Sequence, residues 1–117
     1  MHNFKELKVW KAGIELCKVI FVLTKAFPPE EKFGLISQMT RSAVSIPSNI
    51  AEGCGRKSNK ELYQFLNVAL GSSFELETQV IIAREFNYVT IERSETICAS
   101  IAEIQKMING LQKSLSN

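Results

Sequence analysis

Three basic residues, Arg56, Lys57 and Lys60, lie close together in the stretch GCGRKSNKE. Ser58, with Glu61 three positions later, forms the capping-box pattern that opens a helix, so the basic residues gather at a helix N-terminus. The free amides and the dipole at such a terminus favour anions. The pattern therefore predicts contacts to phosphates, such as those of a nucleic acid. A solvated basic turn without a ligand is the alternative interpretation.

A second group of polar side chains follows one face of the preceding stretch, QMTRSAVSIPSNIAEG. Most of them are small and uncharged, which is unusual for a solvated helix face because Ser and Asn are weak helix formers. A matching polar face recurs further along the chain, so we expect a hydrogen-bonded network between two helices that fixes register more than it adds stability. The expected members are Gln38, Arg41, Asn49, Glu52, Ser72 and Glu75. A partly wet groove without a special role is the alternative.

The sequence contains few groups suited to catalysis or metal binding. Its single histidine is His2, so neither a Glu-x-x-His di-iron motif nor a nucleophile beside an imidazole can be assembled within the chain. Cys17, Cys54 and Cys98 are widely separated and lack C-x-x-C spacing, which predicts reduced, buried thiols. We therefore expect a protein that is not an enzyme and that needs no metal or other cofactor.

Composition and charge describe the protein that must carry these side chains. The 117 residues are 45% hydrophobic and 22% charged, which suffices for one core, so a single domain over residues 1–117 is expected. The net charge of +2 permits contact with nucleic acid but is far below that of a dedicated basic binder. The most apolar stretch, ELCKVIFVLTKAF, contains two lysines and is too short to cross a bilayer. We expect a cytoplasmic protein without a membrane segment.

Four helical segments, and no alternating strand pattern, follow from the periodicity of the apolar residues. Breaks are predicted at FPPEE, GCGRKSNKE and EFNYVT, with Gly53 and Gly55 as a left-handed cap and Thr90 as the N-cap of the last helix. Pro28 and Pro29 are expected to lead into the second helix, with two glutamates in its first turn. Short connections make successive helices antiparallel. The predicted fold is an all-α, up-down-up-down four-helix bundle.

Pro47 lies inside the second predicted helix. The apolar positions keep their three- and four-residue spacing across it, from Ile36 through Ala43 to Ile50. A proline in a helix interior removes a backbone donor and crowds the carbonyl four residues earlier, at a cost of up to about 3 kcal/mol. The pattern predicts one continuous helix with a bend at Pro47.

The first helix has a wider apolar surface than one core requires. Its large apolar side chains spread over more than half of the circumference, whereas a helix at the surface of a bundle needs an apolar arc of about 100°. Trp10, Ile14 and Phe21 belong to this excess. We expect these three residues to lie at a contact with a second subunit. A wide core face within one subunit is the alternative.

Four segments resemble a known bacterial family in their order and spacing: FKELKVW, FPPEEKFGL, QMTRSAVSIPSNIAEG and FLNVALGSSFELETQ. The family is called four helix bundle proteins and is also named for proteins encoded in intervening sequences of 23S rRNA genes. The chain is more distantly similar to the accessory variability determinant proteins of diversity-generating retroelements, which bind nucleic acid and a reverse transcriptase. The resemblance implies an up-down-up-down bundle, assembly as a cyclic homopentamer, and no established catalysis.

Two classes of function remain for such a protein. The first is a non-enzymatic oligomeric bundle associated with structured RNA or another nucleic acid. The second is a scaffold or regulatory adaptor that binds a protein partner and no nucleic acid. No aromatic platform for single-stranded bases accompanies the three basic residues, so nucleic-acid binding there is expected to depend on phosphates and to be steeply salt dependent.

Overall fold

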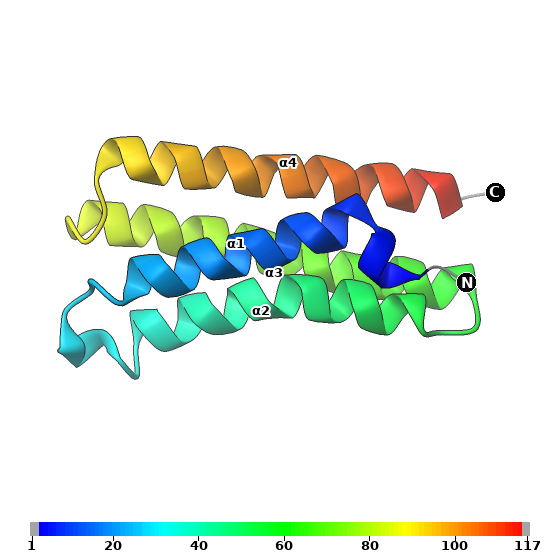
Figure 1. Ribbon diagram of the computed structural model, residues 1–117, viewed down its shortest axis with the longest axis horizontal. Coiled ribbons are helices and arrows are strands. Elements are labelled where there is room, and N and C mark those ends of the chain that lie inside the picture. The colour runs from blue at the N-terminus through cyan, green and yellow to red at the C-terminus, as the bar shows by residue number, and fades with distance from the viewer. Residues whose placement is uncertain (1–2, 116–117) are drawn as a thin grey trace.

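The computed structural model describes residues 3–115. The chain forms four α-helices, α1 (Lys8–Thr24), α2 (Leu35–Cys54), α3 (Asn59–Glu85) and α4 (Ile91–Leu115), with short 3-10 turns η1 (Phe4–Glu6) and η2 (Pro29–Glu31) before α1 and α2. Successive helices run along the long axis in opposite directions (Figure 1). Residues 3–115 contain no strand, and the predicted all-α four-helix bundle is confirmed.

The core runs along the axis of the bundle. α2 packs against α1 and α3, and α4 packs against α3 and, less extensively, against α1. Each helix contributes a stripe of apolar side chains at three- and four-residue spacing, as the sequence predicts. The most deeply buried members of these stripes are Ile20, Met39, Ala43, Ile46, Ile50, Leu62, Leu66, Ala69, Leu76, Val80, Ala83, Ile101, Ile104 and Ile108.

Both predicted N-caps are present. The Ser58 hydroxyl accepts a hydrogen bond from the Glu61 amide at 3.1 Å. The Thr90 hydroxyl accepts one from the Arg93 amide, also at 3.1 Å. Each bond satisfies a backbone donor that a helix start leaves without an intrahelical partner, so α3 and α4 begin where the sequence indicates.

The predicted left-handed cap at Gly53 and Gly55 is wrong, because no glycine within residues 3–115 has a positive φ. Gly53 lies inside α2, where a Cβ atom would stand 2.8 Å from the side chains of Leu62 and Phe65. Close packing of α3 therefore explains this glycine. The left-handed residue is Asn87, with φ of 63°, just beyond the end of α3.

The two prolines start a separate turn, so the expectation that the glutamates open α2 is wrong. Pro29–Glu31 forms η2, and α2 begins later, at Leu35. One carboxylate oxygen of Glu31 accepts a hydrogen bond from the Leu35 amide at 3.4 Å. The other accepts a hydrogen bond from the Tyr88 hydroxyl at 2.9 Å. The second bond is the main cause of the raised pKa of Tyr88, and it joins η2 to the α3–α4 connection.

α2 is continuous across Pro47, as predicted, while the bend stays a prediction. The proline is buried and faces α1. A Cβ atom at Gly13 of α1 would lie 3.3 Å from both Cβ and Cδ of Pro47. The missing side chain of Gly13 is therefore what gives the proline ring room against α1.

Candidate functional site

A polar groove follows the contact between α2 and α3 and has a volume of about 510 Å³. On α3 its lining residues are spaced three and four apart, and on α2 they form two adjacent rows with steps of four, so each helix turns a polar stripe towards it. Four of its residues are serines, whose short side chains leave space between the helices. This α2–α3 groove is lined by Phe33, Ser37, Gln38, Arg41, Ser42, Ser45, Ser72, Glu75 and Gln79.

Hydrogen bonds join α2 and α3 at the groove. The hydroxyl oxygens of Ser45 and Ser72 are 2.8 Å apart and share a hydrogen bond. The Asn49 amide nitrogen donates to the carbonyl oxygen of Ser45 at 2.8 Å and to its hydroxyl oxygen at 2.9 Å. The expected link between Asn49 and Ser72 thus exists, but it passes through Ser45, which lies outside the predicted set.

Gln38, Arg41 and Glu75 also line the groove, as the sequence predicts, but all three are exposed. Within residues 3–115, neither Arg41 nor Glu75 has a hydrogen-bond or ion-pair partner for its side chain. The expectation that Arg41 and Glu75 take part in the hydrogen-bonded network is therefore wrong for residues 3–115 of the single subunit. Their charges face solvent, where a ligand has access to them.

Gln79 is buried in the wall of the groove and is 5% exposed. Its Oε1 atom is buried and has no hydrogen-bond partner among the described residues. Buried polar atoms are nearly always paired, and an unpaired one costs about 1–3 kcal/mol. Gln79 shares a helix face with Ser72 and Glu75, but its burial depends on α2 and was missed from the sequence.

Glu52 does not belong to the groove, so its predicted place in the network is wrong. Its carboxylate pairs with the Arg56 guanidinium at 2.8 Å. The rise of the helix separates Glu52 from Ser45 by about 10 Å along α2, out of reach of Ser72. The Arg56 guanidinium also lies over the ring of Phe65, with 4.8 Å to its centroid.

The three predicted anion contacts lie together, at the α2–α3 connection and the start of α3. Lys57 and Lys60 are exposed, whereas Arg56 is half-buried. Arg56 is already engaged by Glu52 and Phe65, which hold its side chain in place. The two lysines are therefore the more accessible cations of the group.

Positive charge is concentrated at this end of the bundle, where η1, the start of α1, the α2–α3 connection and the end of α4 come together (Figure 1). This basic end carries seven basic and three acidic residues: Lys5, Lys8, Lys11, Arg56, Lys57, Lys60 and Lys113, against Glu6, Glu52 and Glu61. The opposite end carries four basic and five acidic residues: Lys25, Lys32, Arg84 and Arg93, against Glu30, Glu31, Glu85, Glu92 and Glu95. A chain of modest net charge thus has a strongly uneven charge distribution.

An apolar depression of about 410 Å³ lies over α1, α2 and η1. Trp10 and Ile14, two of the three predicted interface residues, line it. The Trp10 ring packs edge-on against the Phe4 ring, with 5.3 Å between the ring centroids. Phe21 lies further along α1, outside the depression, and is 45% exposed. The lining of this α1–α2 depression is Phe4, Trp10, Ile14, Cys17, Val44, Pro47, Ser48 and Ala51.

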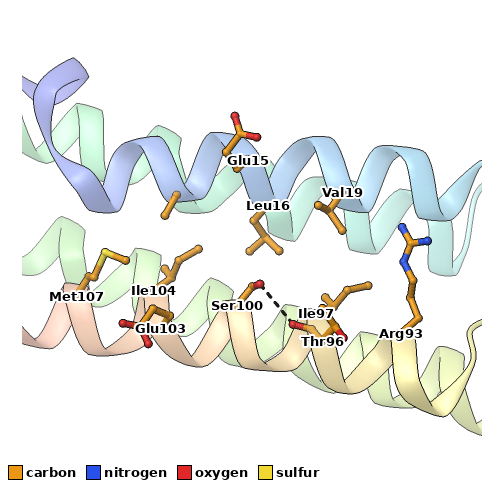
Figure 2. Close-up of a pocket in the computed structure, with 11 residues that line it drawn as sticks. Glu15, Leu16, Val19, Arg93, Thr96, Ile97, Ser100, Glu103, Ile104 and Met107 are labelled. Atoms are coloured by element: carbon orange, nitrogen blue, oxygen red, sulfur yellow. Dashed lines mark hydrogen bonds between the residues drawn. The ribbon is translucent and has the colours of Figure 1, made fainter.

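A further groove, of about 380 Å³, separates α1 from α4 and was missed from the sequence. Leu16, Ile97 and Ile104 provide its apolar side chains between the two helices, while Arg93 and Met107 lie toward its two ends (Figure 2). α1 and α4 make the least extensive contact of the neighbouring helices. The apolar stripe of α4 is narrow, and this sequence signal could have indicated that α4 does not fully cover the apolar surface of α1.

The described part of the chain holds no cluster of three or more His, Cys, Asp or Glu side chains that could bind a metal ion. Burial raises the pKa of the Cys17, Cys54 and Cys98 thiols, with a further contribution from Glu77 at Cys98. A raised pKa lowers the fraction of reactive thiolate. His2 lies outside the described residues. Among residues 3–115, no helix has the length and apolar character required to span a membrane.

Comparison with known proteins agrees with the resemblance seen in the four sequence segments. The family model described as 23S rRNA-intervening sequence protein matches residues 5–110. A crystal structure from Bacteroides thetaiotaomicron, described as a protein with unknown function from the S23 ribosomal protein family, is similar with a TM-score of 0.83 and 30% sequence identity, over 90% of this chain and 98% of that chain. The comparison with curated proteins gives no match. The chain belongs to the 23S rRNA-intervening sequence protein family.

Proposed function

We propose that this protein is a non-enzymatic, RNA-associated bundle that holds RNA phosphates at its basic end. The observation that carries the proposal is the separation of charge: seven of fourteen basic residues, but three of twelve acidic residues, lie at that end. Lys57 and Lys60 are exposed beside the N-terminus of α3, whose amides and dipole favour anions.

Binding at this end depends on phosphates and on RNA shape. Lysine ammonium groups contact phosphate oxygens as point charges and do not read base edges. Each phosphate contact releases counterions, so affinity falls steeply as salt rises. Arg56, held between Glu52 and the Phe65 ring, positions one further cation beside the two lysines.

The test compares two double charge reversals with the same change in net charge. Lys57→Glu with Lys60→Glu alters the basic end, and Lys25→Glu with Arg93→Glu alters the opposite end. We expect the first variant to weaken binding to a structured RNA hairpin. The slope of the logarithm of the binding constant against the logarithm of the salt concentration should also become shallower by about two, because two phosphate contacts are lost. The second variant should change both quantities much less. Equal effects of the two variants, or no salt-dependent binding by the wild-type protein, would contradict the proposal.

A role in protein binding is the second candidate, and the α1–α2 depression favours it. Val44 at this depression is 42% exposed, and Phe21 and Val22 on α1 are 45% and 61% exposed. An apolar depression beside a helix that carries further exposed apolar side chains is typical of a surface that another protein covers. The occupant we favour is a second copy of the chain in a cyclic homo-oligomer, with five subunits implied by the family resemblance. A different protein partner would make the bundle a scaffold. Either assembly is proposed to act in the cytoplasm.

A further inference from the structure

We propose that the α2–α3 groove binds an unpaired guanine base of RNA. This inference rests on the proposed RNA association and names the chemical group that a second site on the bundle would take. The groove volume of about 510 Å³ lies within the range of small-ligand sites. The groove combines a buried acceptor without a partner, an exposed carboxylate, an exposed guanidinium and an exposed aromatic ring, supplied by Gln79, Glu75, Arg41 and Phe33.

Two acceptors at the groove favour a ligand that brings N–H donors: the Glu75 carboxylate is accessible as it stands, and Gln79 Oε1 becomes accessible when its amide turns toward the groove. Gln79 Oε1 is buried without a donor among the described residues, and the Glu75 carboxylate has no partner there. Guanine carries two neighbouring donor groups, N1–H and the exocyclic N2 amine. Adenine has an acceptor at N1 and lacks the N2 amine, so it satisfies fewer of these acceptors. The pair of acceptors therefore favours guanine over adenine.

Arg41 requires the complementary feature in the same ligand. Guanine presents two acceptors, O6 and N7, and arginine binds this pair through two hydrogen bonds more often than it makes any other base-specific contact. O6 is adjacent to the N1–H donor, so one base offers acceptors to Arg41 and donors to Glu75 and Gln79. Arg41 is exposed and unpaired within residues 3–115, so no internal ion pair competes with this contact.

Phe33 supplies a surface on which the base can stack. It lies in the loop before α2, lines the groove, and is 89% exposed. The Lys32 ammonium lies 5.4 Å from the centroid of its ring, which adds a cation next to the aromatic face. Unpaired RNA bases are recognised by stacking on aromatic rings together with hydrogen bonds to the base edges. The groove provides both kinds of contact.

The groove and the basic end lie along the same helix. The rise of α2 places Arg41 about 22 Å from Arg56 at the basic end. A folded RNA of several nucleotides covers such a distance, with its phosphates at the basic end and one loop base in the groove. Phosphate contacts would then determine most of the affinity, and the groove would determine the base preference.

The first test uses four RNA hairpins that differ at one loop base: guanine, inosine, 7-deazaguanine or adenine. We expect the guanine hairpin to bind roughly tenfold more tightly than the adenine hairpin, since a bidentate base contact discriminates by about this factor. Inosine lacks the N2 amine and 7-deazaguanine lacks N7, so both should fall between these limits. Equal binding of the guanine and adenine hairpins would overturn the inference.

The second test uses groove variants with matched controls. Glu75→Gln should reduce the preference for guanine over adenine to nearly one while RNA binding through the basic end persists. Phe33→Ala should weaken both hairpins, because stacking does not distinguish the two bases. Glu95→Gln and Phe74→Ala alter exposed residues that do not line the groove and should bind like the wild type. Phe33 and Glu75 are both exposed, and circular dichroism checks the fold of every variant. A Glu75→Gln variant that keeps the full preference would overturn the inference.

A third measurement separates failure of this inference from failure of the proposed function. Guanosine monophosphate is titrated into the protein while the side-chain amide resonances of Gln79 are followed by NMR. Shifts with this nucleotide, but not with adenosine monophosphate, support the groove even if no hairpin binds, in which case the RNA function fails alone. Hairpin binding without shifts of the Gln79 amide and without base preference would overturn the groove assignment and leave the basic-end proposal standing. Amide shifts that follow protein concentration alone would place a second copy in the groove and also overturn the assignment.

Discussion

The thiol of Cys17 on α1 donates a hydrogen bond to the backbone carbonyl of Ala43 on α2, with 3.3 Å between Sγ and the oxygen. Pro47, four residues after Ala43, has no N–H group and so leaves this carbonyl without its usual helical donor. A side chain from the neighbouring helix therefore replaces the bond that the proline removes. Partial burial at this contact raises the pKa of the Cys17 thiol, which keeps it in the donating, protonated form.

A double-mutant cycle measures this compensation. Cys17→Ala should lower the free energy of unfolding by about 1–2 kcal/mol, because the Ala43 carbonyl loses its donor. In a Pro47→Ala background, the backbone N–H regained at position 47 can donate to the Ala43 carbonyl. The destabilisation caused by Cys17→Ala should therefore be smaller by about 0.5–1 kcal/mol. Urea denaturation of the four proteins gives the coupling energy. An equal cost of Cys17→Ala in both backgrounds would show that the thiol contributes only packing.

The glycines provide a second stability comparison. Gly53→Ala should lower the free energy of unfolding by about 1–3 kcal/mol, since the new Cβ would meet Leu62 and Phe65 at 2.8 Å. Gly71 and Gly110 also lie inside helices, but a methyl group added at either position would meet no atom of a neighbouring element within 4 Å. Their replacement by alanine should raise stability by about 0.5–1 kcal/mol through helix propensity. Thermal denaturation of the three variants is the measurement, and a stabilised Gly53→Ala protein would contradict the close packing of α2 on α3.

Two buried glutamines should respond in opposite ways to the same substitution. The side-chain amide of Gln112 has hydrogen-bond partners: its Nε2 donates to the Asn67 side-chain oxygen at 2.8 Å and to the Tyr63 carbonyl at 3.3 Å. Gln112→Leu should therefore lower stability by about 1–2 kcal/mol. Gln79→Leu removes the unpaired Oε1 and should raise stability by about 1 kcal/mol, as expected where a binding group is kept at the expense of stability. Chemical denaturation compares them, and a destabilised Gln79→Leu protein would show that the amide is already satisfied.

Assembly through the α1–α2 depression predicts a specific effect of an introduced charge. Val44→Arg places a cation at the depression, and Val68→Arg places one on α3, where Val68 is 51% exposed. The first variant should lose self-association because an unpaired charge at a covered apolar surface is costly, while the second should assemble normally. Sedimentation at micromolar concentration gives the oligomeric state, and circular dichroism should show unchanged helix content. A wild-type protein that sediments as a stable monomer would exclude this interface.

The sequence determined the helices because their signals are local. The spacing of Ile97, Ile101, Ile104 and Ile108 defines the buried side of α4 without reference to any other helix. Caps act over three residues, so the starts of α3 and α4 could be assigned from Ser58 and Thr90. Short connections between four amphipathic helices then left few arrangements other than an antiparallel bundle. The position of Gly53 inside α2 and the separate turn at Pro29 were not predicted, because both depend on neighbours distant in sequence.

The tertiary structure decided which polar groups meet, because helical periodicity assigns a face but not an axial offset between helices. The contact between Ser45 and Ser72 shows the offset of α2 against α3, which leaves Glu52 beside Arg56 and buries Gln79 without a donor. Likewise, lysines near residues 5–11 and 113 join those at residues 56–60 only because alternate helices reverse direction and bring these segments to one end (Figure 1). Electrostatic interactions depend on distance in space, so the basic end became visible only when the bundle was assembled.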